Sequence, residues 1–376
     1  MRVLYFTERD TPHDRRFLTA LAGTGYQVFA LRQKACQPET PKGVTECQWP
    51  ERQPDWSNWT GWQDGVAQLS QLLAELKPDL VHAGPVQGPA LVTALAHFHP
   101  LVTMSWGSDL LLTAQRSPWM REATRYALDR TDIFLGDCQT VADAAAGFRF
   151  PREKMVLFPW GVDLKVFSRI NGVLEGKKLR SDLGWERNFV LLCNRYWAPL
   201  YGVDLLARAF AVAVQQEPRL RLLLVGDGPQ ADLIHQILDP LGEKVHFTGR
   251  ISQAELPAYY HTADLYVSPS HSDGSSISLL EAMACGRAVL VSDIPGNREW
   301  VTEGLNGRLF VDGSEADLAE KLVEMVTDPA HSDYRWQAHV TAMERADWTV
   351  NFQKCLQAYR AALDTSLKSF TTPTGE

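Results

Sequence analysis

Short apolar segments alternate along the chain with longer segments in which apolar residues recur at helical spacing. Apolar runs such as 189–193 and 220–225 are typical of buried strands, whereas 66–76 and 202–215 have the pattern of amphipathic helices. Parallel strands need a crossover connection, and a helix usually supplies it. The pattern therefore predicts an α/β protein with doubly wound, Rossmann-like parallel sheets.

The strand–helix alternation occurs twice, and a polar segment rich in basic residues separates the two series. We expect a first domain over 1–165, a linker over 166–186 and a second domain over 187–345. Residues 346–376 are predicted to form a C-terminal helix that packs back toward the first domain, followed by a tail. The tail, 367–376, is expected to be disordered because it is polar and terminal.

Residues 273–286 place two acids on either side of a predicted helix start. Asp273 follows a predicted strand, and Glu281 lies in the second turn of the helix. Between them lie residues suited to a tight loop and a helix start: Gly274, Ser275, Ser276 and Ile277. Because free N–H groups at a helix start attract anions, this stretch suits a ligand with an anionic centre and hydroxyls at both ends. Ordinary helix capping and a solvated glutamate are the alternative interpretation.

Further polar and aromatic residues lie where predicted strands end, and ligands of doubly wound sheets bind at those edges. The first domain places four residues there: Asp14, His82, Trp106 and Asp109. The second domain places Asn194, Arg195 and Gly226 there. A cleft between two such sheets would collect both sets of loops. The structural alternatives are a packed histidine for His82 and a helix cap for Asp109.

Four tryptophans lie within or beside a stretch, 36–63, that is predicted to be irregular: Trp49, Trp56, Trp59 and Trp62. Two interpretations remain open at this point. The tryptophans pack under a long loop, or they form an aromatic platform for a sugar or lipid acceptor.

Composition narrows the class of protein. The net charge of −8 excludes a general basic surface for nucleic acid, and no apolar run approaches the ~20 residues that span a bilayer. The N-terminus meets an acid at Glu8, which favours a first strand over a signal peptide. The six cysteines include no Cys-x-x-Cys pair and the histidines lack ligand spacing, so we expect a cytoplasmic protein without a metal site.

Six motifs in chain order resemble those of the family 4 glycosyltransferases, also called glycosyl transferases group 1, which have the GT-B fold. They are Pro159–Asp163 with Phe167, Val225–Pro229, Phe247–Arg250, Ala263–Ser270, Glu281–Gly286 and Asn306–Gly307. The resemblance implies two Rossmann-like domains facing across a cleft. It also implies transfer of a sugar from a nucleotide-diphosphate-sugar donor, UDP- or GDP-linked, with retention of anomeric configuration.

The resemblance implies roles for single residues. Glu281 would bind the donor ribose, while Asp273 and the backbone of 274–277 would bind the donor sugar and diphosphate. Arg195 would neutralise the diphosphate, which suits a fixed, bidentate cation. The remaining donor-side residues would be Arg250 and Ile251, which frame the base, together with Asn194 and Gly226.

On the acceptor side, Asp109 would face the reacting sugar from the other domain. Asp109, Asp273 and Arg195 are therefore the expected catalytic residues, and His82, Trp106 and Asp14 the expected acceptor-side residues.

Three positions depart from the family pattern. Asp273 stands where the family usually has Glu, Tyr201 stands where it usually has Lys, and Trp106 replaces a His. The diphosphate would then have one cation fewer, and Trp106 would stack on the sugar. These departures leave the donor sugar open.

The enzyme implied by the resemblance is a metal-independent hexosyltransferase of glycan biosynthesis that needs no cofactor. Its acceptor would be a hydroxyl of a glycan, a lipid-linked molecule or a small molecule. A peripheral contact with the inner face of the membrane also stays open. The alternatives are a non-catalytic nucleotide-sugar-binding protein, and a phosphorylase or epimerase on the same fold.

Overall fold

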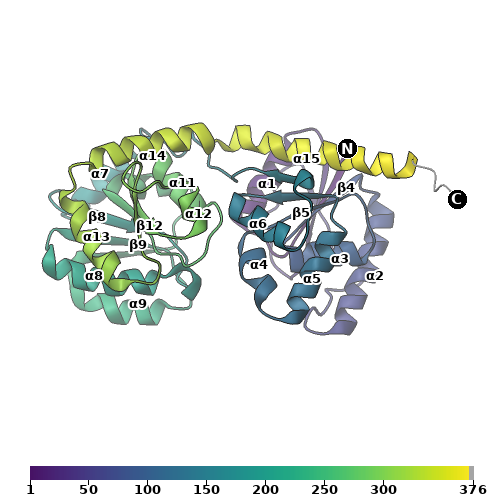
Figure 1. Ribbon diagram of the computed structural model, residues 1–376, viewed down its shortest axis with the longest axis horizontal. Coiled ribbons are helices and arrows are strands. Elements are labelled where there is room, and N and C mark those ends of the chain that lie inside the picture. Colours follow the sequence, from purple (N-terminus) through teal and green to yellow (C-terminus); the bar gives the residue numbers. More distant parts are fainter. Residues whose placement is uncertain (372–376) are drawn as a thin grey trace. The chain divides into compact units, whose positions relative to one another are not determined.

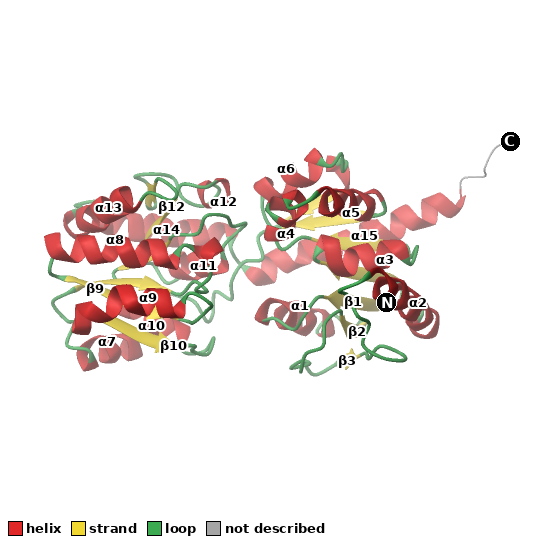
Figure 2. Cartoon of the chain, turned by 90° about the horizontal axis from the view of Figure 1, so that it is seen from below, coloured by secondary structure: helices red, strands yellow, loops and turns green. Residues whose placement is uncertain are grey.

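The strands of the chain form two separate parallel sheets in the computed structural model, which describes residues 1–371 and the side chains up to residue 364 (Figure 1). The first unit contains Met1–Phe158 and the residues from Phe352 on, and the second unit contains Pro159–Asn351. Figure 2 shows helices on both sides of the strands in each unit. The α/β fold class predicted from the sequence is confirmed.

The sheet of the first unit has seven strands in the order β3-β2-β1-β4-β5-β6-β7. In that order the strands are Val44–Glu46, Gln27–Arg32, Arg2–Thr7, Leu80–Gly84, Leu101–Met104, Ile133–Gly136 and Met155–Leu157. The α-helices are α1 Pro12–Ala22, α2 Trp59–Leu76, α3 Leu91–Leu95, α4 Ser108–Leu111, α5 Pro118–Asp129, α6 Gln139–Gly147 and, from Phe352 on, α15 Trp348–Thr371. Shorter turns are η1 Val86–Ala90, η2 Thr113–Gln115 and η3 Arg152–Lys154.

Alternating side chains of these strands point to opposite faces, so each strand supplies two cores. Leu4 and Phe6 pack with Leu69 of α2 on one face. On the other face, the ring of Tyr5 lies 6.4 Å from that of Phe17 in α1, and Phe17 lies 6.3 Å from Phe352 in α15. Helix α15 therefore completes the core of the first unit from the far end of the chain.

The sheet of the second unit has six strands in the order β10-β9-β8-β11-β12-β13. In that order they are Val245–Gly249, Leu220–Val225, Phe189–Cys193, Leu265–Ser268, Ala288–Ser292 and Arg308–Phe310. The α-helices are α7 Val173–Asp182, α8 Val203–Gln216, α9 Ala231–Leu238, α10 Leu256–Thr262, α11 Ile277–Ala284, α12 Pro295–Arg298, α13 Glu315–Thr327 and α14 His331–Arg345. Shorter turns are η4 Pro199–Tyr201 and η5 Asp239–Lys244.

The same alternation builds the two cores of the second unit. Leu191 belongs to the core that also contains residues of α8, α9 and α13, whereas its neighbour Leu192 belongs to the core with residues of α10, α11 and α14. Both faces of the sheet are covered, which is why its strands read as continuous apolar runs. Because helices cover both faces, a ligand can approach this sheet only at its ends, and ligands of doubly wound sheets bind at the carboxyl ends of the strands.

Several elements differ from the sequence prediction. The segment expected to be a linker contains α7, which packs against α10. The stretch 36–63 contains β3 and the start of α2. The apolar spacing over 252–262 predicts a helix capped by Ser252, but α10 begins at Leu256 and residues 252–255 form a turn before it. Of the tail expected to be disordered, 367–371 end α15, and 372–376 lie outside the described residues.

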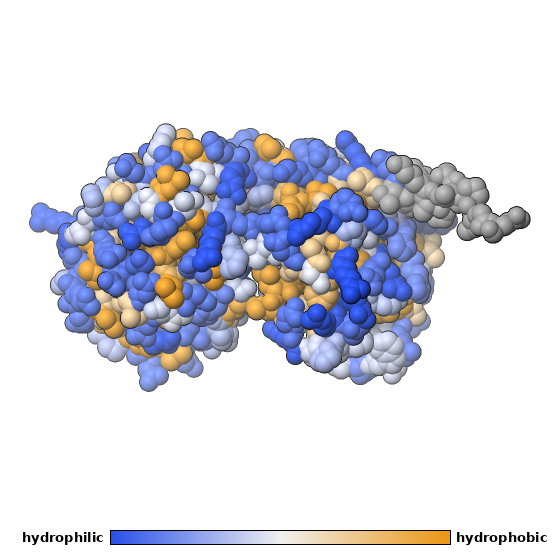
Figure 3. All heavy atoms as spheres, viewed as in Figure 1, coloured by the Kyte–Doolittle hydropathy of each residue, from blue (hydrophilic) through white to orange (hydrophobic). Residues whose placement is uncertain are grey.

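The face drawn in Figure 3 is mostly hydrophilic, with apolar side chains in scattered patches. Within the described part of the chain, no helix has the length and apolar character that crossing a membrane requires.

Candidate active site

Helix α11 starts in a densely packed loop of the second unit. Strand β11 leads into this loop, and a Cβ atom on Gly296 of α12 would lie 2.3 Å from the carbonyl oxygen of Asp273. A glycine at 296 therefore lets α12 lie directly against the loop. Ser276 is the N-cap residue of α11, but its side chain makes no capping hydrogen bond to the helix. The first N–H groups of α11 thus keep their capacity to bind another acceptor.

The hydroxyl of Ser276 is instead used to hold Arg195, which follows β8. Arg195 Nη1 donates to Ser276 Oγ at 2.7 Å and to Ser278 Oγ at 2.9 Å, while Nη2 donates to Asp273 Oδ2 at 2.5 Å. The guanidinium also lies over the ring of Tyr201, 4.6 Å from its centroid. Arg195 is therefore fixed beside the start of α11 by contacts from three segments of the unit.

The positive charge of Arg195 is paired with the carboxylate of Asp273 in the same unit. Burial lowers the pKa of Arg195, but the carboxylate of Asp273 more than offsets this effect and raises it, so the guanidinium stays charged. Arg195 Nε is buried and has no partner among the described residues. A positive charge with unused donors next to a helix start is an arrangement that binds phosphate groups.

Glu281 lies on α11, is only 3% exposed, and is held by two side chains. Tyr260 of α10 donates its hydroxyl to Glu281 Oε2 at 2.7 Å, and Gln253 Nε2 donates to Oε1 at 2.8 Å. Burial, followed by the nearby Glu281, raises the pKa of Tyr260 well above its usual range, so its hydroxyl remains a donor. Gln253 is exposed, and a ligand hydroxyl can take over its hydrogen bond.

The other residues that the sequence analysis expects on the donor side lie at the same edge of the sheet. Asn194 Nδ2 donates to the Tyr260 hydroxyl at 2.8 Å, which links Asn194 to Glu281. Gly226 has a φ of 115°, a conformation that requires glycine, and its N–H donates to the Gly249 carbonyl at 2.8 Å. Two further buried polar atoms, Asn194 Oδ1 and Trp197 Nε1, also lack partners among the described residues.

The two residues expected to frame the base differ in environment. Arg250 is exposed, whereas Ile251 is half-buried and packs against the core that contains α11.

In the first unit, Asp109 lies in the short helix α4 and is 5% exposed. Its Oδ1 accepts from Ser105 Oγ at 2.6 Å, and its Oδ2 accepts from the Val86 N–H at 3.0 Å. Burial raises the pKa of this carboxyl, and these two hydrogen bonds partly offset the rise. Asp109 and the half-buried Trp106 line a hollow of about 460 Å³, which we call the acceptor hollow after the role that the sequence analysis expects of these two residues. Its other lining residues are Glu8, Gln33, Lys34, Trp56, Trp62, Pro85, Gln87, Gly88, Ser108, Thr113, Arg116 and Met120.

Two residues expected on the acceptor side are enclosed by side chains of their own unit. His82 is fully buried, and its Nδ1 lies 2.6 Å from the hydroxyl of Tyr359 in α15. Asp14 is the third residue of α1 and forms a capping box with Thr11, while Tyr5 donates to its other oxygen at 3.0 Å. The contact of these two side chains with an acceptor, expected from the sequence, stays a prediction.

Comparison with known proteins identifies the family. The family described as Glycosyl transferases group 1 matches residues 187–328, and the family described as Glycosyl transferase 4-like matches residues 2–139. The chain belongs to the family 4 glycosyltransferases. The two matches fall on the two units, one on each sheet.

Curated members of this family match parts of the chain. A D-inositol 3-phosphate glycosyltransferase of Thermomonospora curvata is 30% identical over 54% of this chain and 51% of its own length. A phosphatidyl-myo-inositol mannosyltransferase of Mycobacterium leprae is 30% identical over 48% of each chain. The chain spans about half the length of these relatives.

Solved structures match over almost the whole chain. Anabaena HepE in complex with UDP-glucose has a TM-score of 0.78 at 22% identity, covering 96% of this chain and 100% of that one. Sucrose-phosphate synthase from Thermosynechococcus elongatus has a TM-score of 0.77 at 20% identity, covering 96% and 98%. These likenesses show the GT-B fold.

The structure places three side chains beside Arg195 or Glu281 that the sequence did not single out: Gln253, Tyr260 and Ser278. Ser278 could have been found, because it lies one residue beyond the predicted loop and helix start. Tyr260 and Gln253 carry no local signal, since they reach Glu281 only through the packing of α10 and its preceding turn beside α11. No group of three or more His, Cys, Asp or Glu side chains suited to a metal ion occurs in the part of the chain that the structure describes.

Proposed function

We propose that the chain is a retaining glycosyltransferase that transfers a hexose from a nucleoside diphosphate sugar, UDP- or GDP-linked, to an acceptor hydroxyl. The observation that carries this proposal is the fixed Arg195 beside the uncapped start of α11. Charge builds up on the departing diphosphate in the transition state. A preorganised guanidinium and helix N–H groups lower the free energy of that charge.

The donor would lie along α11. Its diphosphate would take the N–H groups of 277–279 and the free donors of Arg195, and its ribose would replace Gln253 on Glu281. Asp273 would contact the donor sugar as well as hold Arg195. In this arrangement Arg195 carries the charge that the family's usual Lys would share, because Tyr201 stacks on it without adding charge.

Asp109 would orient the acceptor hydroxyl or remove its proton in the acceptor hollow. A carboxyl with a raised pKa is the stronger base, and burial produces that rise here. Trp106 lines the same hollow and offers a flat apolar face to a sugar ring. The protein would need no metal, since Arg195 and the helix start supply the positive charge.

The first test is to incubate the protein with a panel of UDP- and GDP-sugars and to measure nucleotide release. UDP-glucose is tried first, because HepE was solved with it. Without an added acceptor the sugar is transferred to water, so proton NMR recorded before the released sugar mutarotates gives the anomeric configuration. The reaction is then repeated in EDTA. Release of nucleotide without inversion, unchanged by EDTA, is expected. Donor binding without any turnover would favour the alternative, a non-catalytic nucleotide-sugar-binding protein. The argument for this alternative is that Tyr201 stands where the family usually has a Lys.

A further inference from the structure

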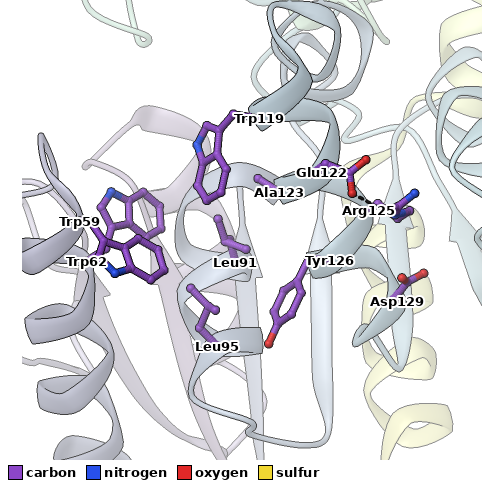
Figure 4. A pocket seen from close by; sticks show the side chains of 10 residues that line it. All are labelled: Trp59, Trp62, Leu91, Leu95, Trp119, Glu122, Ala123, Arg125, Tyr126 and Asp129. Atoms are coloured by element: carbon purple, nitrogen blue, oxygen red, sulfur yellow. Dashed lines mark hydrogen bonds and ion pairs between the residues drawn. The ribbon is translucent and has the colours of Figure 1, made fainter.

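The acceptor hollow shares one wall with a second hollow of the first unit. Trp62 of α2 lines both. The second hollow, which we call the tryptophan pocket, has a volume of about 380 Å³ and lies between residues of α2, α3 and α5 (Figure 4). Its lining residues are Trp59, Trp62, Leu91, Leu95, Trp119, Glu122, Ala123, Arg125, Tyr126 and Asp129.

Two tryptophans at its rim are unusually exposed. Trp59 is 57% exposed and Trp119 is 56% exposed, although burial of an indole is strongly favourable. Each lies in the first turn of a capped helix: Asn58 Oδ1 accepts from the Gly61 N–H at 2.9 Å, and Ser117 Oγ caps α5. The caps fix the backbone that carries both side chains, while the rings themselves remain open to solvent.

The interior of the tryptophan pocket offers carbon and few polar partners. Leu91 and Leu95 lie between the tryptophans and Tyr126 in Figure 4, and Ala123 is 4% exposed. Glu122 and Arg125 are paired with each other at one end. The indole N–H of Trp62 already donates a hydrogen bond to the carbonyl oxygen of Trp56, with 3.1 Å between Nε1 and the oxygen. A buried sugar needs partners for its hydroxyls, whereas a hydrocarbon chain needs only such a wall.

We propose that the tryptophan pocket binds a hydrocarbon chain of the acceptor, whose hydroxyl-bearing end lies in the acceptor hollow beside Asp109. The acceptor is then an amphiphile with one apolar chain, and Trp62 separates its two parts. The assignment to the acceptor rests on the proposed function; the affinity of the pocket for a chain does not.

The test measures binding of n-alkyl β-D-glucosides, from methyl to decyl, by isothermal titration below their micelle concentrations and without nucleotide. The affinity of the wild-type protein is expected to rise about two- to fourfold per methylene. The double variant Trp59→Ala/Trp119→Ala should lose at least tenfold in decyl glucoside affinity. The control is Trp336→Ala, which removes an indole that is 53% exposed on α14 and should stay within twofold of wild type.

Four outcomes would overturn the proposal. The first is an affinity that does not depend on chain length, and the second is an equal loss of affinity in Trp336→Ala. The third is binding of methyl glucoside or cellotriose that depends on Trp59 and Trp119 and is as tight as that of decyl glucoside, and the fourth is binding to phosphatidylglycerol vesicles without binding to the monomeric glucosides. The third would indicate a sugar platform and the fourth a membrane-docking surface. If the wild type binds the chains but turns over no donor, the proposed function fails and the pocket assignment stands.

Discussion

Replacing Arg195 with alanine should abolish most of the catalytic power without unfolding the protein. A guanidinium has five N–H donors, and three of those of Arg195 are used by Asp273, Ser276 and Ser278. Two donors therefore remain for the diphosphate. A hydrogen bond to a charged group contributes about 1.5–3 kcal/mol, so the loss is about 3–6 kcal/mol. This corresponds to a fall of about 10²–10⁴ in kcat/KM.

Arg195→Lys keeps the charge but loses the planar fork, so we expect an intermediate fall of about 10–10². The matched control is Arg208→Ala on α8. Arg208 also joins two acids, Asp204 at 3.0 Å and Glu315 at 3.1 Å, but it is 40% exposed and contributes little. Initial rates of nucleotide release give kcat/KM for each variant, and circular dichroism confirms folding. A folded Arg195→Ala protein within threefold of the control would refute the proposed role of Arg195.

Three further predictions follow from side chains described above. Glu281→Ala should raise the donor KM about a hundredfold, whereas Gln253→Ala should leave it equal or lower; equal effects in steady-state kinetics would contradict exchange of Gln253 for the ribose. Burial lowers the pKa of His82 to about 3, from about 6.5 in the unfolded chain. As the pH falls, the unfolded state therefore binds the proton first, and the free energy of unfolding should drop by about 2 kcal/mol between pH 8 and pH 5. His82→Asn, which can keep the bond to Tyr359, should reduce that loss in urea unfolding, and an unchanged pH dependence would show that His82 is not the group responsible. Asp109→Asn should lower kcat about 10²–10⁴-fold and remove the acid limb of the pH–rate profile. Its affinity for the nucleoside diphosphate of the active donor, measured by titration calorimetry, should be unchanged, and a retained limb would exclude Asp109 as the base.

The fold and the second unit's cluster were largely accessible from the sequence, because their signals are local. Strand runs, helical spacing and the loop before α11 each lie within one short stretch. The position of Arg195 directly after β8 indicated a ligand-facing edge, and the structure brings it to Asp273 and Ser276. What the sequence could not give was how Asp273 is used: its shorter side chain forms an ion pair with Arg195.

The features that the sequence did not reveal share one physical cause, which is packing between segments far apart in the chain. A polar residue at a strand end has the same signature whether it faces a ligand or a covering helix, and His82 is covered by Tyr359. Helix α7 was missed because its sequence is polar. It packs through Gly176, where a Cβ atom would lie 2.7 Å from the carbonyl oxygen of Ala258 in α10.

The contribution of α15 to the first unit also has a consequence for biosynthesis. The hydrogen bond between His82 and Tyr359 joins residues 277 positions apart in the chain, and the whole second unit is translated between them. On the ribosome, the second unit has all of its own residues before the first unit has its last helix. Until α15 is translated, the first unit exposes the apolar face that Phe352 and Tyr359 later cover. Such an exposed face can bind chaperones or promote aggregation. The first unit thus cannot complete its core until α15 has been translated.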